Sequence, residues 1–271
     1  MKKLLILLLL LGVAGSACAS VDWLAGATTS DWFTAANWSN GVPVLTPTTN
    51  TRTYGSSANP SYMPIINSGA AVAHQLDIGG GARATQAVTG SVTLNGSTST
   101  LTVTDYFRTG SSSTSNRWGA FYMNDGTVNV GNYLTIGYGS GTVDVRGWLD
   151  MNAGTINVTN AFTIGNAAGA SGYVDLDGGT INAGNFVMKA TAGTGTVELD
   201  IWGSKIVITG DKTVAIQGYI DNAWIKSNGV AWTLYDNVSY DVGTNKTTII
   251  PEPATLCLLG LGALSLIRRK R

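Results

Sequence analysis

Six polar side chains recur at matched places in neighbouring repeats, and they are the residues of this sequence best suited to chemistry. Counted against the glycine that marks each repeat, one set is equivalent and a second set follows two residues later: Asp150, Asp175 and Glu198, then Asn152, Asp177 and Asp200. Like charges on adjacent strands repel. Either the carboxylates splay into solvent, or a hard cation such as calcium bridges them. Paired carboxylates on one face could also catalyse sugar hydrolysis.

Outside this ladder the sequence offers no catalytic set. His74 is the single histidine, and a Ser-His-Asp or Cys-His arrangement would need it as the base. No G-x-S-x-G elbow supplies a nucleophile. The stretch "GGGARA" at 79–84 fits a loose dinucleotide fingerprint, but strand and turn residues follow where a helix is required. We expect a non-catalytic protein without a cofactor, calcium excepted; the alternative is a polysaccharide lyase or hydrolase.

Tryptophans offer a second kind of chemistry, because an exposed indole can stack on a sugar ring. The candidates are Trp118, Trp148, Trp202, Trp224 and Trp232. Such residues more often belong to a core or a cap. Exposure on a shared face would indicate a carbohydrate-binding protein.

The elements that position these residues are repeats. Four related segments read "VTLNGSTSTLTV", "FYMNDGTVNVGNYLTIG", "LDMNAGTINVTNAFTIG" and "VDLDGGTINAGNFVM". Their glycines, Gly96, Gly126, Gly154 and Gly179, are 30, 28 and 25 residues apart. Within each segment apolar and polar residues alternate with the period of a half-buried strand. A strand pattern at a fixed long period indicates a repeat architecture.

Three short strands per repeat fit one coil of a right-handed parallel β-helix, an all-β solenoid with stacked apolar ladders. Glycine and asparagine are expected to take left-handed conformations at its corners. An antiparallel sandwich remains open, because "LNG" and "NDG" also suit hairpin turns. We see no helical period outside the two termini.

The repeats divide the chain into five parts. Residues 20–63 are rich in tryptophan and proline and are expected to cap the first coil, since an open end exposes unpaired backbone. Residues 64–242 hold the repeats and a less regular closing cap. A short polar linker, 243–250, is predicted to lead to the tail at 251–271, and the signal peptide occupies 1–19.

Composition limits the partners. Between residues 20 and 250 there are ten basic and fifteen acidic residues, so this part carries about five net negative charges. Nucleic acid as a partner would call for a basic patch. The same stretch contains no cysteine, since the two in the chain are Cys18 and Cys257. Disulfides are therefore not expected, although an exported protein could form them.

The first residues predict a secretory signal peptide with a helical apolar segment. Two lysines precede a ten-residue apolar run, and small residues follow. Cleavage is expected between Ala19 and Ser20, with Ala17 at the third position before the cut. The rival reading is a lipoprotein signal acylated at Cys18, but a glycine stands three residues before that cysteine, where a larger aliphatic residue is usual.

The closing segment has three ordered parts. Pro251, Glu252 and Pro253 come first, an apolar run that predicts a helix follows at 254–267, and four cations end it: Arg268, Arg269, Lys270 and Arg271. At 1.5 Å per residue the run spans about 21 Å, short of the roughly 30 Å of a bilayer core. The cations would hold its end at the cytoplasmic side.

This segment resembles the PEP-CTERM sorting signal of Gram-negative bacteria. The resemblance implies recognition at the inner membrane by an exosortase that cleaves near the Pro-Glu-Pro motif, and an association with extracellular polysaccharide. The repeats are similar to glycine-rich β-solenoid proteins that often carry this tail, with "NWSNGVP" and "GDKTVAIQGYI" as opening and closing motifs. We expect an exported structural protein of the cell surface or matrix, held transiently at the inner membrane; the alternative is a polysaccharide-binding or polysaccharide-degrading β-helix.

Overall fold

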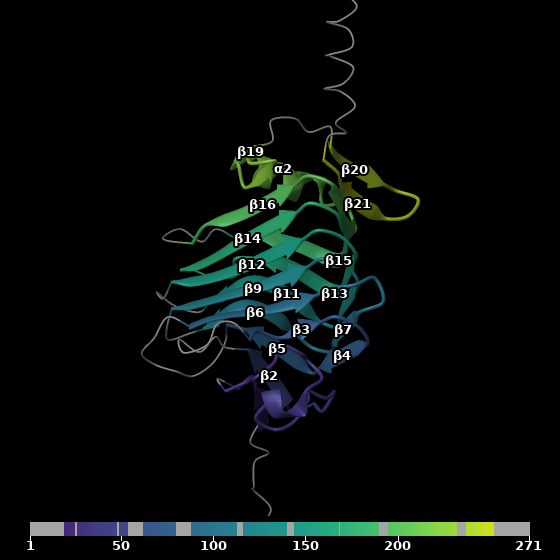
Figure 1. Cartoon of the computed structure of the whole chain (residues 1–271). Coiled ribbons are helices and arrows are strands. Elements are labelled where there is room, and N and C mark those ends of the chain that lie inside the picture. The colour runs from purple at the N-terminus through teal and green to yellow at the C-terminus, as the bar shows by residue number, and fades with distance from the viewer. Residues whose placement is uncertain are drawn as a thin grey trace, which may run out of the picture.

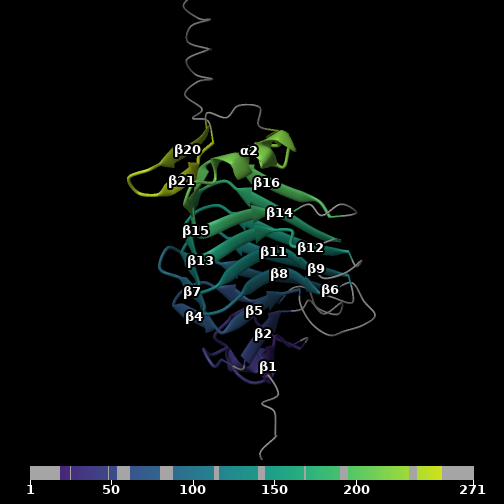
Figure 2. The same cartoon turned by 180° about the vertical axis from the view of Figure 1, so that it is seen from behind.

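A computed structural model describes residues 19–24, 26–47, 49–53, 62–79, 88–112, 116–139, 144–167, 169–189, 195–231 and 237–251. The chain winds through about six coils that stack into a column, with the N-terminal strands at one end and the C-terminal hairpins at the other (Figure 1). Seen from behind, the same coils present a second set of stacked strands (Figure 2). The predicted solenoid is confirmed in its main feature, an all-β stack of coils.

An eight-stranded sheet forms what we call face 1 of the column. In spatial order it contains β3 (Ile65–Ile66), β6 (Val88–Leu94), β9 (Arg117–Met123), β12 (Val145–Met151), β14 (Ala170–Leu176), β16 (Val197–Ile201), β18 (Ile225–Ser227) and β19 (Val230–Ala231). Each coil contributes one strand, so residues of successive coils lie side by side.

A thirteen-stranded sheet forms the other two faces. Face 2 contains β4 (Ala70–Ala73), β7 (Thr100–Val103), β10 (Thr127–Val130), the first halves of β13 (Thr155–Ile164) and β15 (Gly179–Met188), and β17 (Ser204–Thr209). Face 3 contains β1 (Ala19–Asp22), β2 (Thr49–Thr53), β5 (Gln75–Ile78), β8 (Phe107–Ser112), β11 (Tyr133–Gly139) and the second halves of β13 and β15.

Parallel pairing between coils decides against the antiparallel sandwich. β9 pairs with β12 in parallel from Arg117↔Val145 to Met123↔Met151, and β12 pairs with β14 in the same way. In two coils, a pair of strands that was expected to be separate forms one continuous strand. β13 and β15 each run across the corner between faces 2 and 3, and their pairing has a register shift between Val158 and Ala161. The antiparallel pairs among the described strands belong to the C-terminal cap.

The inward side chains stack into apolar columns because every coil repeats the same alternation. One column of face 1 consists of fully buried residues: Leu94, Met123, Met151, Leu176 and Ile201. On face 2 the equivalent column is Leu101, Val128, Ile156, Ile181 and Ile206. Complete burial of each such side chain contributes about 1.5–3 kcal/mol. Because residues 20–250 contain no cysteine, no disulfide can stabilise this part of the chain, and these columns are its main source of stability.

The corners between faces 1 and 2 use the glycines that marked the repeats. Gly96, Gly126, Gly154 and Gly179 all have φ between 86° and 105°. The expectation of left-handed asparagines there is wrong: the described non-glycine residues with positive φ are Ala223, Asn228 and Asn245, all in the closing cap. The corner asparagines instead form amide ladders, because stacked carboxamides can each donate to the next coil.

One such ladder runs along the rim of face 1. Asn95 donates to Asn67 at 2.9 Å, Asn124 donates to Asn95 at 2.7 Å, and Asn152 donates to Asn124 at 2.9 Å. A second runs along face 2, where Asn157 donates to Asn129 and Asn182 donates to Asn157, each at 2.9 Å. Asparagine thus holds adjacent coils in register rather than turning the chain.

Where faces 1 and 3 meet, backbone touches backbone. A Cβ on Gly147 would lie 2.1 Å from the backbone nitrogen of Gly137 and 2.4 Å from Oγ1 of Thr109. A Cβ on Gly119 would lie 2.1 Å from the carbonyl oxygen of Ile78. Such distances leave no room for any side chain. This seam explains why many glycines occur in the chain. Some positions need glycine because a Cβ would clash with the neighbouring backbone, and not only because the chain turns there.

Residues 20–63, predicted as a cap, supply β1, β2 and a small aromatic core below the first coil. Trp23 and Trp38 pack edge to face with ring centroids 4.9 Å apart, and Trp32 and Trp38 do so at 4.8 Å. All three are buried. The 3₁₀ turn η1 (Ala35–Asn37) carries the buried Asn37, whose amide donates to Oγ1 of Thr29 at 2.8 Å.

The closing cap differs from expectation in two ways. The helix α2 (Thr213–Asp221) was not predicted; its buried Ile216 and Ile220 are one turn apart, but the β-branched residues and glycine around them hid that period. The predicted linker at 243–250 is wrong as well. β21 (Lys246–Ile249) lies there, pairing antiparallel with β17 and with β20 (Val238–Asp241), and its buried Thr247 and Ile249 close the column.

The predicted signal helix and tail helix lie outside the described residues, as do the Ala17 position of the cleavage rule, Glu252, Pro253 and the four C-terminal cations. In the part of the chain that the structure does describe, no helix is long and apolar enough to cross a bilayer. Ala19 and Ser20 begin β1, which pairs with β2 through Ala19↔Thr49.

Candidate functional site

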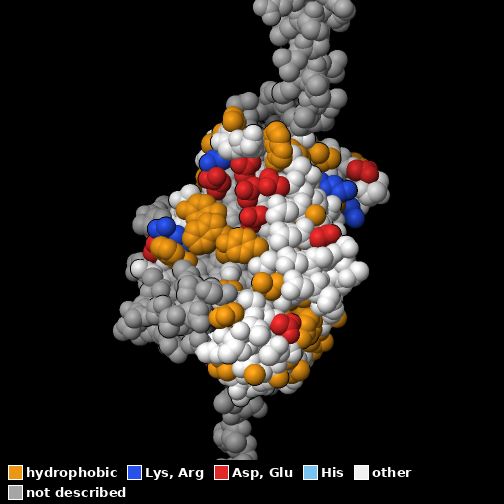
Figure 3. Space-filling model, in the orientation of Figure 1, with side chains coloured by type: hydrophobic (Ala, Val, Ile, Leu, Met, Phe, Trp, Pro, Cys, Tyr) orange, Lys and Arg blue, Asp and Glu red, His pale blue; other side chains and the backbone are white. Residues whose placement is uncertain are grey.

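Face 1 brings together most of the residues that the sequence singled out. Along β9, β12, β14 and β16, alternate side chains point outward from the column. The outward face changes character from coil to coil. Aromatic side chains gather over β9 and β12, and carboxylates gather beside them toward β16 (Figure 3).

Four aromatic side chains form what we call the aromatic cluster: Trp118, Tyr122, Trp148 and Tyr173. Trp148 and Tyr173 are directly paired across β12 and β14, and their rings stack with centroids 5.5 Å apart and planes 17° apart. Trp118 meets Trp148 edge to face at 6.4 Å. Tyr122 is 41% exposed. A large aromatic surface thus faces outward on a rigid sheet.

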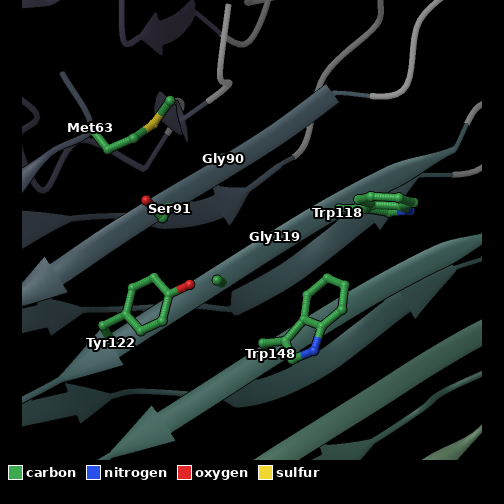
Figure 4. A pocket seen from close by; sticks show the side chains of 8 residues that line it. Met63, Gly90, Ser91, Trp118, Gly119, Tyr122 and Trp148 are labelled. Carbon is green, nitrogen blue, oxygen red and sulfur yellow. The ribbon is translucent and has the colours of Figure 1, made fainter. Parts of the chain in front are cut away.

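A hollow of about 440 Å³ opens within this cluster. Its described lining is Met63, Gly90, Ser91, Trp118, Gly119, Ala120, Tyr122 and Trp148 (Figure 4). The hollow exists because Ala120 and Ser91, which are much smaller than Trp148, stand in the same column one coil and two coils earlier. Ligand pockets usually enclose about 300–1,000 Å³ and are mostly apolar with a few polar groups. The hollow fits that description.

The basic side chains near the cluster are neutralised locally. The guanidinium of Arg146 meets the carboxylate of Asp144 through two contacts of 2.8 and 3.0 Å, and it lies 5.0 Å from the Trp118 ring. Further along the face, Nζ of Lys226 lies 2.7 Å from a carboxylate oxygen of Glu198. Neither cation therefore forms an ion pair with Asp150, Asp175 or Asp177.

The carboxylates form a column on this face, but in a different register from the one expected. Asp150 pairs with Asp175, as predicted, and Asp175 pairs with Asp200 rather than with Glu198. Glu198 stands two residues earlier, opposite Tyr173. The error arose because the repeat glycine is replaced in the sixth coil, where Ser204 pairs with Gly179. Counted from Ser204, Asp200 is the equivalent residue.

Asp177 belongs to the rim of the face. Its backbone nitrogen donates to the carbonyl of Met151, as Asn152 donates to Met123 one coil earlier. Asp177 thus occupies the position equivalent to Asn152, as predicted, whereas Trp202 rather than Asp200 occupies that position in the next coil. Asp200 accepts a hydrogen bond from the backbone nitrogen of Gly229 at 2.6 Å.

Burial and mutual repulsion both raise pKa values within this column. Partial burial raises the pKa of Asp175, and the charges of Asp177, Asp200, Asp150 and Glu198 raise it further. Burial also raises the pKa of Asp150, with a contribution from Asp177. Among the described residues, no group of three or more His, Cys, Asp or Glu side chains is arranged to hold a metal ion. The calcium interpretation of the five carboxylates stays a prediction.

The remaining sequence candidates lie elsewhere. Nδ1 of His74 lies 2.9 Å from Oγ1 of Thr104 in a bond between coils. Trp202 is 52% exposed, whereas Trp224 packs on the core and stacks on Tyr219 at 5.9 Å. Trp232 and most of "GGGARA" lie outside the described residues. Tyr122 and Tyr173 were missed, although each lies two or four residues from another outward residue on its strand.

The C-terminal end of the chain matches a family model. A model described as the PEP-CTERM protein-sorting motif matches residues 250–271. The chain carries a PEP-CTERM protein-sorting motif. Such a motif implies an exported protein that is anchored transiently in a membrane and is sorted by an exosortase, itself a membrane protein.

The PEP-CTERM match covers the tail alone. Neither the search of curated proteins nor the search of solved structures found a match. The PEP-CTERM segment starts directly after β21, whose Ile249 is fully buried. The molecular role of the folded part must therefore be inferred from face 1 itself.

Proposed function

We propose that this protein is a structural component of the cell surface or extracellular matrix of a Gram-negative bacterium. In this proposal the tail holds the right-handed solenoid at the inner membrane, and an exosortase then cuts near Pro251, Glu252 and Pro253. The observation that carries it is the sorting motif at residues 250–271. Support also comes from the described fold, in which a cut at the motif leaves every described strand with the solenoid.

A non-catalytic role is part of this proposal. The described carboxylates of face 1 follow one another along a column, and His74 is engaged with Thr104 across two coils. In this proposal neither set of side chains acts on a substrate. Stability of the column through coil-to-coil ladders is what a structural role requires.

The sorting step is tested by the mass of the mature protein. Cells that contain an exosortase should release or display a chain that lacks Arg271. Replacement of Pro251, Glu252 and Pro253 by alanine should leave Arg271 in place, as should deletion of the exosortase in the same strain. Recovery of Arg271 in the mature protein from unmodified cells would make the tail a lasting anchor.

A second function, carbohydrate binding, is favoured by the aromatic hollow. Trp118, Trp148 and Tyr122 line a hollow on a rigid sheet, as an amphipathic sugar ring requires. The purified full-length chain should then be retained by polysaccharide without releasing products. Release of oligosaccharides would instead support the enzymatic alternative.

A further inference from the structure

We propose that the hollow and the carboxylate column beside it bind a glycan whose sugars carry free, protonated amino groups, such as a β-linked glucosamine polymer. The inference deepens the carbohydrate-binding function proposed above and rests on it. Three features of face 1 carry it: an aromatic wall, a carboxylate beside the hollow, and the pairing of the nearest cation, Arg146, with Asp144.

The aromatic wall is Trp148. Tyr173 stacks on it from the coil of β14, and the hollow lies on the other side, toward β9. Trp148 therefore keeps one face for a ligand while Tyr173 supports the other. Ser91 and Ala120 leave the space in front of that face open, and Ser91 supplies a hydroxyl there. A sugar ring can stand in this space with its C–H face against the indole.

The carboxylate beside the hollow is Asp150. It lies two residues after Trp148 on β12, which is about 6.6 Å along a strand. Asp150 is also directly paired with Tyr122 on β9, another lining residue. Asp175 is one strand further, about 4.8 Å away between strand axes. A sugar in the hollow thus has the start of the carboxylate column beside it.

Charge selects the ligand. Among the ion pairs of the described residues, none includes Asp150, Asp175 or Asp177. A positive charge on a ligand would relieve the repulsion among these three carboxylates. A polyuronate would add to the repulsion, and a neutral glycan would leave it unchanged. A protonated amine both relieves it and forms charge-assisted hydrogen bonds.

The test compares three hexasaccharides that share a β-1,4-linked backbone and differ at C2. They are the glucosamine hexamer, the N-acetylglucosamine hexamer and cellohexaose. Calorimetric titration of the full-length chain at low ionic strength should give the glucosamine hexamer at least about tenfold tighter binding, equal to about 1.4 kcal/mol. Added salt should remove that advantage, because exposed charges are screened.

Variants separate the two halves of the site. Trp148→Ala should weaken all three hexamers about tenfold or more, whereas Asp150→Asn with Asp175→Asn should remove only the advantage of the amino sugar. If Trp148→Ala does not fold, Tyr122→Ala provides the aromatic test, with the similarly exposed Tyr133→Ala on face 3 as its control. Asp221→Asn on α2 controls for the loss of charge.

Each outcome has a definite meaning. Equal binding of all three hexamers would keep carbohydrate binding and overturn the selectivity for amines. Tightest binding of a galacturonate hexamer would also overturn it. If no sugar binds, carbohydrate binding itself is wrong. If, in addition, Trp148→Ala or Tyr122→Ala lowers the molar mass measured by light scattering, the face is an interface between copies of this chain.

Discussion

Alanine at position 147 should disrupt the seam where faces 1 and 3 meet. The added Cβ would lie 2.1 Å from the nitrogen of Gly137, 2.4 Å from Oγ1 of Thr109 and 2.8 Å from the carbonyl oxygen of Thr109. Two of these atoms belong to the backbone of neighbouring strands and cannot rotate away. Gly147 lies outside the described positive-φ glycines, so the substitution tests contact distance alone.

The expected cost follows from overpacking. Inserting a methyl group into a packed site usually costs about 1–3 kcal/mol, and the fixed backbone places Gly147→Ala at about 3 kcal/mol or more. For a chain of this size, that lowers the melting temperature by roughly 6–12 °C. Gly218→Ala is the matched control, because its Cβ would meet nothing within 4 Å inside α2. Helix propensity predicts that it stabilises the protein by about 0.5–1 kcal/mol.

Both variants can be compared by thermal and urea unfolding followed by circular dichroism. The seam predicts opposite signs for the same chemical change at the two sites. An unchanged midpoint for Gly147→Ala would refute the reasoning, because it would mean that the two faces do not approach to backbone contact. A loss of stability at Gly218 would point instead to a general intolerance of alanine.

Three further predictions concern the ladders and the acidic column. Asn157→Ala breaks two amide hydrogen bonds, and Asn182→Ala breaks one. Urea unfolding should therefore show a loss of stability of about 1–3 kcal/mol for Asn157→Ala and about half that loss for Asn182→Ala. Equal losses would count against the ladder. The pKa of Asp175 is raised in the folded chain, so its ionisation destabilises the fold above that pKa, and the penalty disappears as pH falls toward the unfolded value near 3.8. Asp175→Asn should therefore raise the melting temperature at pH 7 and leave it unchanged at pH 3. The gain in stability at pH 7 should be at most about 1 kcal/mol, because the side chain is exposed. An equal effect at both pH values would exclude repulsion as the cause. Calcium should raise the melting temperature no more than sodium chloride of equal ionic strength, and a larger, chelator-reversible rise would restore the calcium interpretation.

Local rules account for what could be predicted of the fold. The period of the glycines and the two-residue alternation between them predicted three strands per coil and parallel stacking. The pairing confirms the parallel stacking, whereas β13 and β15 each join two of the expected strands into one. The same counting failed at the sixth coil, where Ser204 replaces the glycine and the register of Asp200 was lost. It also failed at α2 and β21, because short segments of β-branched residues fit helix, strand and linker equally well.

The repeat, the inward columns and the sorting tail could be predicted from the order of the amino acids, because each depends on residues close together along the chain. The other features depend on how the chain folds. The tertiary structure brought Trp118, Tyr122, Trp148 and Tyr173 together from three coils, since outward residues become neighbours only through strand pairing. It opened a hollow because small residues one and two coils earlier face the same side as Trp148. It also showed that glycine allows the backbones of two sheets to come into contact. That contact depends on the distance between strands that are far apart in sequence.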